Sequence, residues 1–261
     1  MDDPGIQHRS VDRIQDTRIR SATDALVVER PLQFIANETP LLTTMRTPGH
    51  DEELVIGHLL TEGVIRDAND VLIELKPGED VDVACIALRR GVPTEALLAL
   101  RRAGISVSSC GVCGRVEKPE VTTRPVSGLT IDTQQAAAML RKMTGGQTLF
   151  AQTGGVHAAA LFDQADAFPM VVREDIGRHN ALDKVIGWLC AQEQAPRAMA
   201  LTTSGRASYE ILYKAAAAGI GTVISVSAAS TLAVDTAQQR GITLMGFFRG
   251  DKAVVYHRVT P

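Results

Sequence analysis

The chain has 261 residues, of which 45% are hydrophobic and 22% are charged, and its formal net charge at pH 7 is −3. This composition is ordinary for a folded globular protein, and the small net charge excludes a general electrostatic attraction to nucleic acid or to a membrane surface. No apolar run approaches the ~20 residues that a membrane-spanning helix requires.

The first twenty residues mix acidic and basic side chains and lack the apolar stretch of a secretory signal. We therefore expect a mobile tail over residues 1–20. Four cysteines in a chain of this length do not form a disulfide scaffold, and without a signal the sequence predicts a cytoplasmic protein. In that compartment a Cys-x-x-Cys pair is more typical of reactive or metal-bound thiols than of a structural disulfide.

Residues 21–105 predict a smaller α/β lobe. A helix is expected to begin near Asp51, where acidic residues suit the first turn, and to stop at Gly63. A second helix is expected over residues 94–103. Short strands are expected where apolar runs are bounded by turn residues, at residues 25–29, 32–37, 41–46, 71–76 and 81–88.

Residues 106–130 predict a cysteine loop and a proline-containing linker, and residues 131–261 predict the main α/β core. A helix begins at Asp132, and residues 156–162 and 168–173 are expected to pair as a hairpin. Helices and strands then alternate, which predicts a mainly parallel sheet covered on both faces. The expected helices span 180–190, 207–218 and 231–239, and the expected strands span 198–203, 222–227, 242–247 and 253–257.

Polar side chains follow three of these strands, at residues 174–180, 204–206 and 228–230. If the strands are parallel, the three clusters share one edge of the sheet, where open α/β sheets bind ligands. Helix N-termini and arginine forks suit phosphate groups, so we hypothesise a large anionic ligand such as a nucleotide or a pyrophosphate. The candidate lining residues are Asp175, Arg178, His179, Ser204 and Arg206.

A simpler alternative is that Asp175 and Arg178 only cap a helix and pair with each other. The usual phosphate-binding motifs G-x-x-x-x-G-K-[ST] and G-x-G-x-x-G do not occur in the sequence. His157 is a further candidate for binding the anionic ligand, because it comes just after Gly154-Gly155-Val156, whose glycines have the flexibility of a ligand-approach turn. A lone histidine entering an apolar strand is nevertheless more often a core residue.

The most informative motif is the pair Cys110 and Cys113, whose glycine-rich surroundings predict a flexible, exposed loop. Three interpretations remain open from the residues alone. Structural zinc usually takes four protein ligands, often two Cys-x-x-Cys pairs, and the sequence contains only one such pair. Thiol–disulfide exchange favours a pair at a helix N-terminus, which the neighbouring glycines do not predict. Sulfur carriage needs an accessible thiolate, which Arg115 and Lys118 would favour.

Taken together, several motifs resemble those of the FdhD family of formate dehydrogenase accessory proteins, which are sulfur carriers in molybdenum cofactor maturation. The resemblance covers nearly the whole chain after the expected tail. It is carried by residues 57–65 (GHLLTEGVI), 109–114 (SCGVCG), 153–160 (TGGVHAAA), 174–184 (EDIGRHNALDK), 204–210 (SGRASYE) and 227–234 (SAASTLAV).

The resemblance implies a function and a set of partners. Members of this family take sulfur from a cysteine desulfurase and deliver it to the molybdenum or tungsten centre of a bis-guanine-dinucleotide molybdopterin cofactor, before that cofactor enters formate dehydrogenase. The implied fold is a cytidine-deaminase-like three-layer α/β/α core without a zinc site, and a homodimer is expected. An alternative function is a cofactor-binding chaperone without persulfide chemistry, and a nucleotide deaminase is a more remote one.

The resemblance also assigns residues. Cys110 falls on the family's persulfide carrier, and Cys113 falls on the second cysteine, to which we give a supporting role. The cofactor segment of the family falls on Phe247, Phe248, Arg249, Gly250, Asp251 and Lys252.

Overall fold

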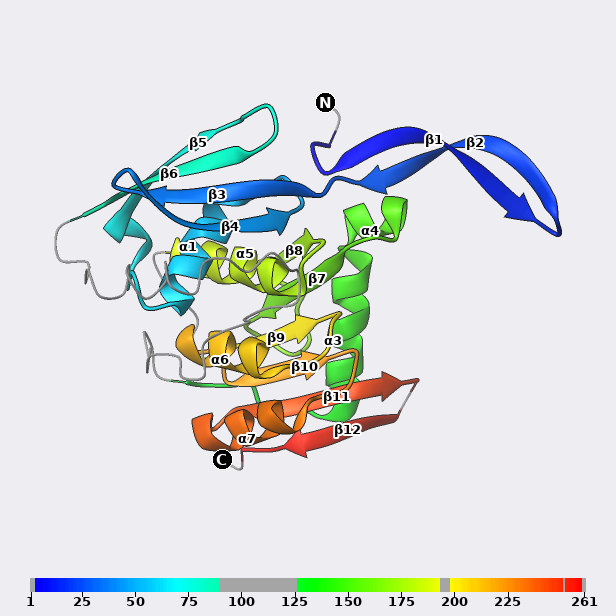
Figure 1. Cartoon of the computed structure of the whole chain (residues 1–261). Helices are drawn as coiled ribbons and strands as arrows, with labels where there is room; N and C mark the ends of the chain where they lie inside the picture. Colours follow the sequence, from blue (N-terminus) through cyan, green and yellow to red (C-terminus); the bar gives the residue numbers. More distant parts are fainter. Residues whose placement is uncertain (1–2, 90–125, 193–197, 251, 260–261) are drawn as a thin grey trace.

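The computed structural model describes residues 3–89, 126–192, 198–250 and 252–259. Cys110, Cys113 and Asp251 lie outside these residues, as do the helix expected over 94–103 and most of the predicted linker. The described residues form two mixed sheets, a separate strand pair and the helices that cover the sheets (Figure 1).

A six-stranded sheet organises the C-terminal half of the chain, in the strand order β12–β11–β10–β9–β7–β8. Strands β9, β10 and β11 are parallel neighbours, and β7 runs antiparallel to both β8 and β9. The predicted hairpin and the parallel run of β9, β10 and β11 are therefore confirmed. The prediction of a mainly parallel sheet is wrong, because three of the five strand pairings are antiparallel. The strands are His157–Phe162 (β7), Val171–Asp175 (β8), Ala200–Thr203 (β9), Thr222–Ser225 (β10), Thr243–Arg249 (β11) and Lys252–His257 (β12).

Helices cover both faces of this sheet, which confirms the predicted α/β class. Phe162 packs with α3 on one face, whereas its neighbour Leu161 packs with α5 and α6 on the other, because consecutive strand residues point to opposite sides. The helices are Thr133–Gly145 (α3), Thr148–Thr153 (α4), Arg178–Cys190 (α5), Tyr209–Ala217 (α6) and Thr231–Arg240 (α7). None of the helices in the described ranges combines the length and apolar character needed to cross a membrane.

The N-terminal lobe is a four-stranded sheet in the order β4–β3–β6–β5, with one helix against it (Figure 1). Gly57 of that helix, α1, and Gly187 of α5 allow the two helices to approach closely. A Cβ atom on Gly57 would overlap the carbonyl of Asp183, and one on Gly187 would overlap the carbonyl of Glu53. The elements are Arg30–Ala36 (β3), Thr39–Arg46 (β4), Asp51–Thr61 (α1), Ala68–Asp70 (η1), Val71–Lys76 (β5) and Asp82–Leu88 (β6).

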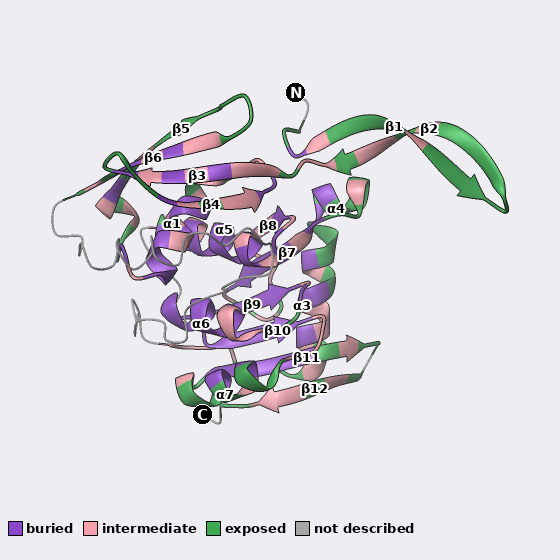
Figure 2. Ribbon diagram, in the orientation of Figure 1, coloured by how far each residue is buried: buried purple, intermediate pink, exposed green. Residues whose placement is uncertain are grey.

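The lobe and the main sheet share one hydrophobic core. Phe34 of β3, Leu59 of α1 and Leu182 of α5 are all fully buried and belong to the same cluster as Leu212 of α6. Figure 2 shows this continuous buried interior between the two sheets. The lobe therefore fixes the position of α5, whose N-terminus opens onto one edge of the six-stranded sheet.

The prediction of a mobile tail over residues 1–20 is wrong. Two antiparallel strands occupy this region, Ile6–Gln15 (β1) and Arg18–Val27 (β2). We call this pair the arm. Its two turn residues, Asp16 and Thr17, have φ of 49° and 75°, as a tight two-residue hairpin turn requires. The strand expected over 25–29 is likewise the end of β2 and the start of the link to β3.

Candidate functional site

Several predicted site residues meet at one edge of the six-stranded sheet, where β8, β9, β10 and β11 end and β7 begins. Ser204, just after β9, accepts a hydrogen bond from the Ala158 N–H at 2.9 Å, and its Oγ lies 3.2 Å from Nδ1 of His157. Arg178 packs beside them, around Gly205. A Cβ atom built on Gly205 would lie 3.1 Å from Arg178 Cδ and 3.7 Å from His157 Nδ1, so both side chains border this glycine. The structure thus brings together His157, Arg178 and Ser204.

Three polar atoms at this edge are buried and have no hydrogen-bond partner among the residues that the structure describes. They are Arg178 Nε and His179 Nε2 in the first turn of α5, and Ser208 Oγ at the N-cap of α6. Buried polar groups are normally hydrogen-bonded, and the first N–H groups of a helix also need acceptors. An anion at this edge would therefore satisfy Arg178, Ser208 and the two helix N-termini, whereas His179 Nε2 faces the Glu210 carboxylate at 3.6 Å.

The third predicted cluster, residues 228–230, has a structural role in the described chain. Ser230 is the N-cap of α7, and its Oγ accepts a hydrogen bond from the Ala233 N–H at 3.2 Å. Arg206 lies at the same edge as Ser204 and is exposed, so its guanidinium is open to solvent.

Both histidines of the edge are held neutral. Burial, followed by the nearby Arg178, lowers the pKa of His157. Burial also lowers the pKa of His179 to about 4, although Glu210, whose carboxylate lies 3.6 Å from Nε2, opposes the shift. Neutral imidazoles can donate or accept hydrogen bonds. The positive potential of the edge consequently comes from arginine and from the helix N-termini.

We expect His179 to make the protein less stable in mild acid. The unfolded chain binds the imidazole proton near pH 6.5 and the folded chain only near pH 4, so stability falls as the pH drops through this window, by about 3 kcal/mol in total. In urea unfolding between pH 7 and 4, the free energy of unfolding of His179→Gln should fall less steeply with decreasing pH than that of the wild type. The exposed His8, changed to glutamine, is the matched control, and an unchanged acid slope in His179→Gln would contradict the assignment.

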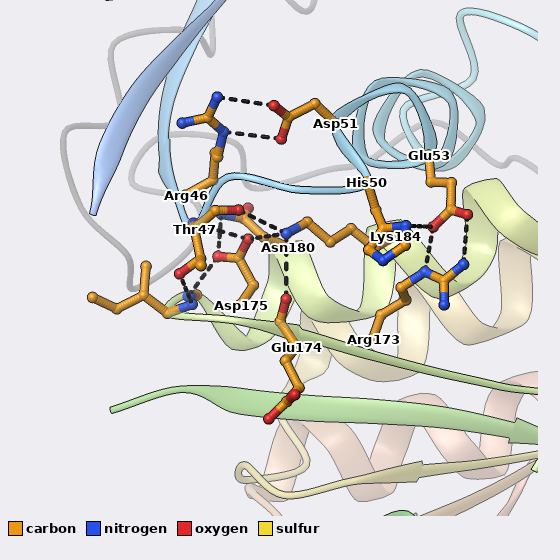
Figure 3. Close-up of polar contacts among 12 residues, drawn as sticks. Arg46, Thr47, His50, Asp51, Glu53, Arg173, Glu174, Asp175, Asn180 and Lys184 are labelled. Atoms are coloured by element: carbon orange, nitrogen blue, oxygen red, sulfur yellow. Dashed lines mark hydrogen bonds and ion pairs between the residues drawn. The ribbon is translucent and has the colours of Figure 1, made fainter. Parts of the chain in front are cut away.

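Asp175 lies inside the protein, which corrects its predicted place on the ligand surface. It is fully buried, its Oδ2 is 2.7 Å from Lys184 Nζ, and Oδ2 also accepts from the Thr47 N–H at 3.2 Å (Figure 3). Its Oδ1 accepts from the Gly177 N–H at 2.9 Å and from Asn180 Nδ2 at 3.1 Å. The ion-pair partner is thus Lys184 and not Arg178, and Asp175 positions the start of α5 from within.

The segment of β11 and β12 predicted to bind cofactor ends at the same sheet edge. Phe247 is exposed, has φ of 56°, and lies 4.5 Å from the guanidinium carbon of Arg249, which stacks over its ring. Gly250 also has positive φ, and Phe248 is half-buried against the core. Lys252 is exposed. An exposed aromatic ring and an arginine form a surface on which a planar base can stack.

The edge is long enough for an extended ligand. From β8 to β11 there are four inter-strand intervals, which at about 4.8 Å each span roughly 19 Å. Sequence reasoning did not single out Ser208, although it lies within residues 204–210, which carry part of the family resemblance. It also missed the buried pair of Asp183 and Lys214, which the half-buried His58 joins and which braces α5, α6 and α1 behind the edge.

The sequence model of the FdhD/NarQ family matches residues 27–260. The chain belongs to the FdhD/NarQ family. This FdhD/NarQ chain is 42% identical over 267 residues to "Sulfur carrier protein FdhD" of Mycobacterium tuberculosis, with 96% of each chain covered. It is 43% identical over 246 residues to the protein of the same name from Nocardia farcinica, with 89% of this chain and 86% of the relative covered.

A solved structure supports the fold of the FdhD/NarQ chain. The crystal structure of a candidate formate dehydrogenase accessory protein from Desulfotalea psychrophila matches with a TM-score of 0.74 and 22% identity, and 97% of both chains is covered. At this identity the match establishes the shared fold.

Proposed function

We propose that this FdhD/NarQ protein is a sulfur carrier that serves the maturation of formate dehydrogenase. The observation that carries the proposal is the 42% identity, over 96% of both chains, to a mycobacterial protein named as a sulfur carrier. The accessory-protein description of the structural neighbour agrees with the second half of the proposal.

In the mechanism we propose, Cys110 carries the sulfur as a persulfide. The Cys110 thiolate attacks the terminal sulfur of a persulfide on a cysteine desulfurase. A new S–S bond forms at Cys110 while the S–S bond of the desulfurase breaks and returns its cysteine as a thiolate, so there is no net oxidation. Cys113 supports this step. Arg115 and Lys118, close in sequence, favour the thiolate form.

The proposed acceptor is a bis-guanine-dinucleotide molybdopterin with molybdenum or tungsten, bound as substrate. The sheet edge supports this part of the proposal, because Arg178 and Ser208 present buried polar atoms that have no hydrogen-bond partner in the described parts of the chain, with His179 and two helix N-termini beside them. These groups suit a phosphate. Phe247 and Arg249 would stack on a guanine, and the remaining candidate contacts are His157, Ser204, Arg206, Phe248, Gly250, Asp251 and Lys252.

Three further features belong to the proposal. We infer a cytidine-deaminase-like relationship for the six-stranded sheet and its helices, a homodimeric assembly, and a cytoplasmic location. The family resemblance and the cysteine content motivate them.

We expect Cys110→Ala to abolish activation of formate dehydrogenase while leaving the fold and guanine nucleotide binding intact. The alanine removes the thiol that carries the transferred sulfur in the proposed mechanism. Cys85→Ala is the matched control, because Cys85 is a half-buried free cysteine on β6. Activation is measured as formate oxidation after maturation with each variant, and full activation by Cys110→Ala would refute the mechanism.

The rival function is a chaperone that binds the cofactor without persulfide chemistry, and the unpaired polar atoms of the edge are compatible with it. Intact mass spectrometry separates the two. After incubation with a cysteine desulfurase and cysteine, a carrier gains the mass of one sulfur atom that a reductant removes. A chaperone gains nothing.

A further inference from the structure

The arm formed by β1 and β2 is anchored at its base and projects away from the body of the molecule (Figure 1). At the base, Gly155 lies against Val27, where a Cβ atom would come within 2.8 Å of Val27 Cγ1, and Gly5 lies similarly close to Thr47. The outer half is exposed on both faces (Figure 2). Ile14 and Ile19, paired next to the turn, are 73% and 66% exposed.

The register gives the arm two chemically different faces. Directly opposed residues of an antiparallel pair point to the same side, and the side alternates along each strand. Ile14 therefore shares a face with Ile19, to which it is paired. The opposite face carries the arginines of the arm and a single carboxylate, and its charged members are Arg9, Arg13, Arg18, Arg20 and Asp24.

The arginines of the basic face destabilise the arm by repelling one another. Arg13 lies directly opposite Arg20 in the ladder, and like charges at such positions repel. The ion pair of Arg13 with Asp24, at 2.7 Å, is between side chains that are 63% and 41% exposed, so it offsets little of this repulsion. A two-stranded pair is marginally stable in water by itself. An acidic surface against Arg13, Arg18 and Arg20 would relieve the repulsion.

We propose that the tip of the arm inserts into a cleft of an acidic partner protein. The arginine face lies against carboxylates, and Ile14 and Ile19 lie against an apolar wall on the opposite side. A tip with two unlike faces fits a cleft better than a flat surface. This proposal concerns residues 6–27 only and is independent of the persulfide chemistry.

Two other occupants are disfavoured by the same features. A nucleic acid would leave the isoleucine face without an apolar partner. A two-fold pairing of arms through their basic faces would set one arginine cluster against another, because the same patch meets itself in such an interface.

The test uses the full chain and fluorescence anisotropy with three labelled probes at matched charge: polyglutamate, a glutamate–tyrosine copolymer and a short DNA duplex. We expect the copolymer to bind about tenfold more tightly than polyglutamate, since it offers both chemistries. R13Q/R18Q/R20Q should lose about tenfold on both polymers. I14S/I19S should bind polyglutamate as the wild type does but should no longer bind the copolymer more tightly than polyglutamate.

The matched control is R66Q/R141Q/R258Q, which removes the same charge from exposed arginines elsewhere on the surface. An equal loss of binding in this control would overturn the proposal, because net charge alone would then explain it. Tighter binding of DNA than of the copolymer would also overturn it. So would a change of oligomeric state in sedimentation of the arm variants, which would make a second copy of the chain the occupant.

Discussion

Replacing Lys214 with methionine is expected to destabilise the protein by about 3–5 kcal/mol. The ammonium group of Lys214 on α6 is fully buried and lies 2.7 and 2.8 Å from the two carboxylate oxygens of Asp183 on α5. It also donates to Thr61 Oγ on α1 at 3.0 Å. Methionine keeps the length of the side chain but leaves the Asp183 carboxylate buried without its cation. Urea unfolding at pH 7 measures the loss.

A surface lysine provides the control for this prediction. Lys76 pairs with Glu74 at 3.1 Å, but the two side chains are 54% and 69% exposed, so Lys76→Met should change stability by less than about 1 kcal/mol. The double variant Asp183→Leu with Lys214→Met should recover part of the loss, because no uncompensated charge remains. A Lys214→Met variant as stable as the wild type would show that the pair contributes nothing.

The ion pair of Asp183 with Lys214 also predicts how the stability of the fold changes at acidic pH. Burial opposes ionisation of Asp183, but Lys214 and the hydrogen bond from His58 outweigh it and lower the pKa of Asp183 from 3.8 to about 2. A depressed carboxyl pKa contributes stability above pH 3.8, and this contribution is lost as the pH falls toward 2. The difference between the wild type and Lys214→Met should therefore shrink over that interval.

The regular part of the core was predictable from local pattern. Strands β9, β10 and β11 are short apolar runs between helices, and that alternation predicts the parallel, helix-covered part of the sheet. The capping box of α3, in which Asp132 Oδ1 accepts from the Gln135 N–H at 2.8 Å, marks its start in the sequence. The shared strand-end edge followed from this topology, and so did the meeting of Arg178 with Ser204.

What the sequence did not predict depends on contacts between distant segments. The arm was missed because its turn residues, Asp16 and Thr17, lack the glycine that usually signals a tight hairpin, and its strands are too polar to read as buried. The buried ions were missed for a different reason. A lysine in a helix such as Lys184 ordinarily reaches solvent, and only the approach of Thr47 and Asp175 from other elements encloses it.

Asp175→Asn is expected to cost about 3 kcal/mol or more, since it leaves the ammonium of Lys184 buried without its counter-charge. That ammonium is 1% exposed, and its remaining protein contacts are the carbonyls of Thr47 at 2.9 Å and Glu174 at 3.3 Å. For a chain of this size the thermal midpoint should fall by about 10 °C. Asp24→Asn, which removes an exposed ion pair with Arg13, is the control and should change the midpoint little.

The same variant separates an interior role for Asp175 from contact with the proposed ligand. Measured well below its midpoint, Asp175→Asn should keep its affinity for guanine nucleotide within about threefold, because asparagine can still accept from the Gly177 N–H at the start of α5. Arg178→Gln should behave in the opposite way, with a small change in stability and a loss of about tenfold in affinity, since Arg178 packs beside Gly205 at the edge and its Nε has no hydrogen-bond partner in the described parts of the chain. If Asp175→Asn instead loses nucleotide binding at unchanged stability, the carboxylate must reach the ligand, and the buried pair with Lys184 cannot be its resting arrangement.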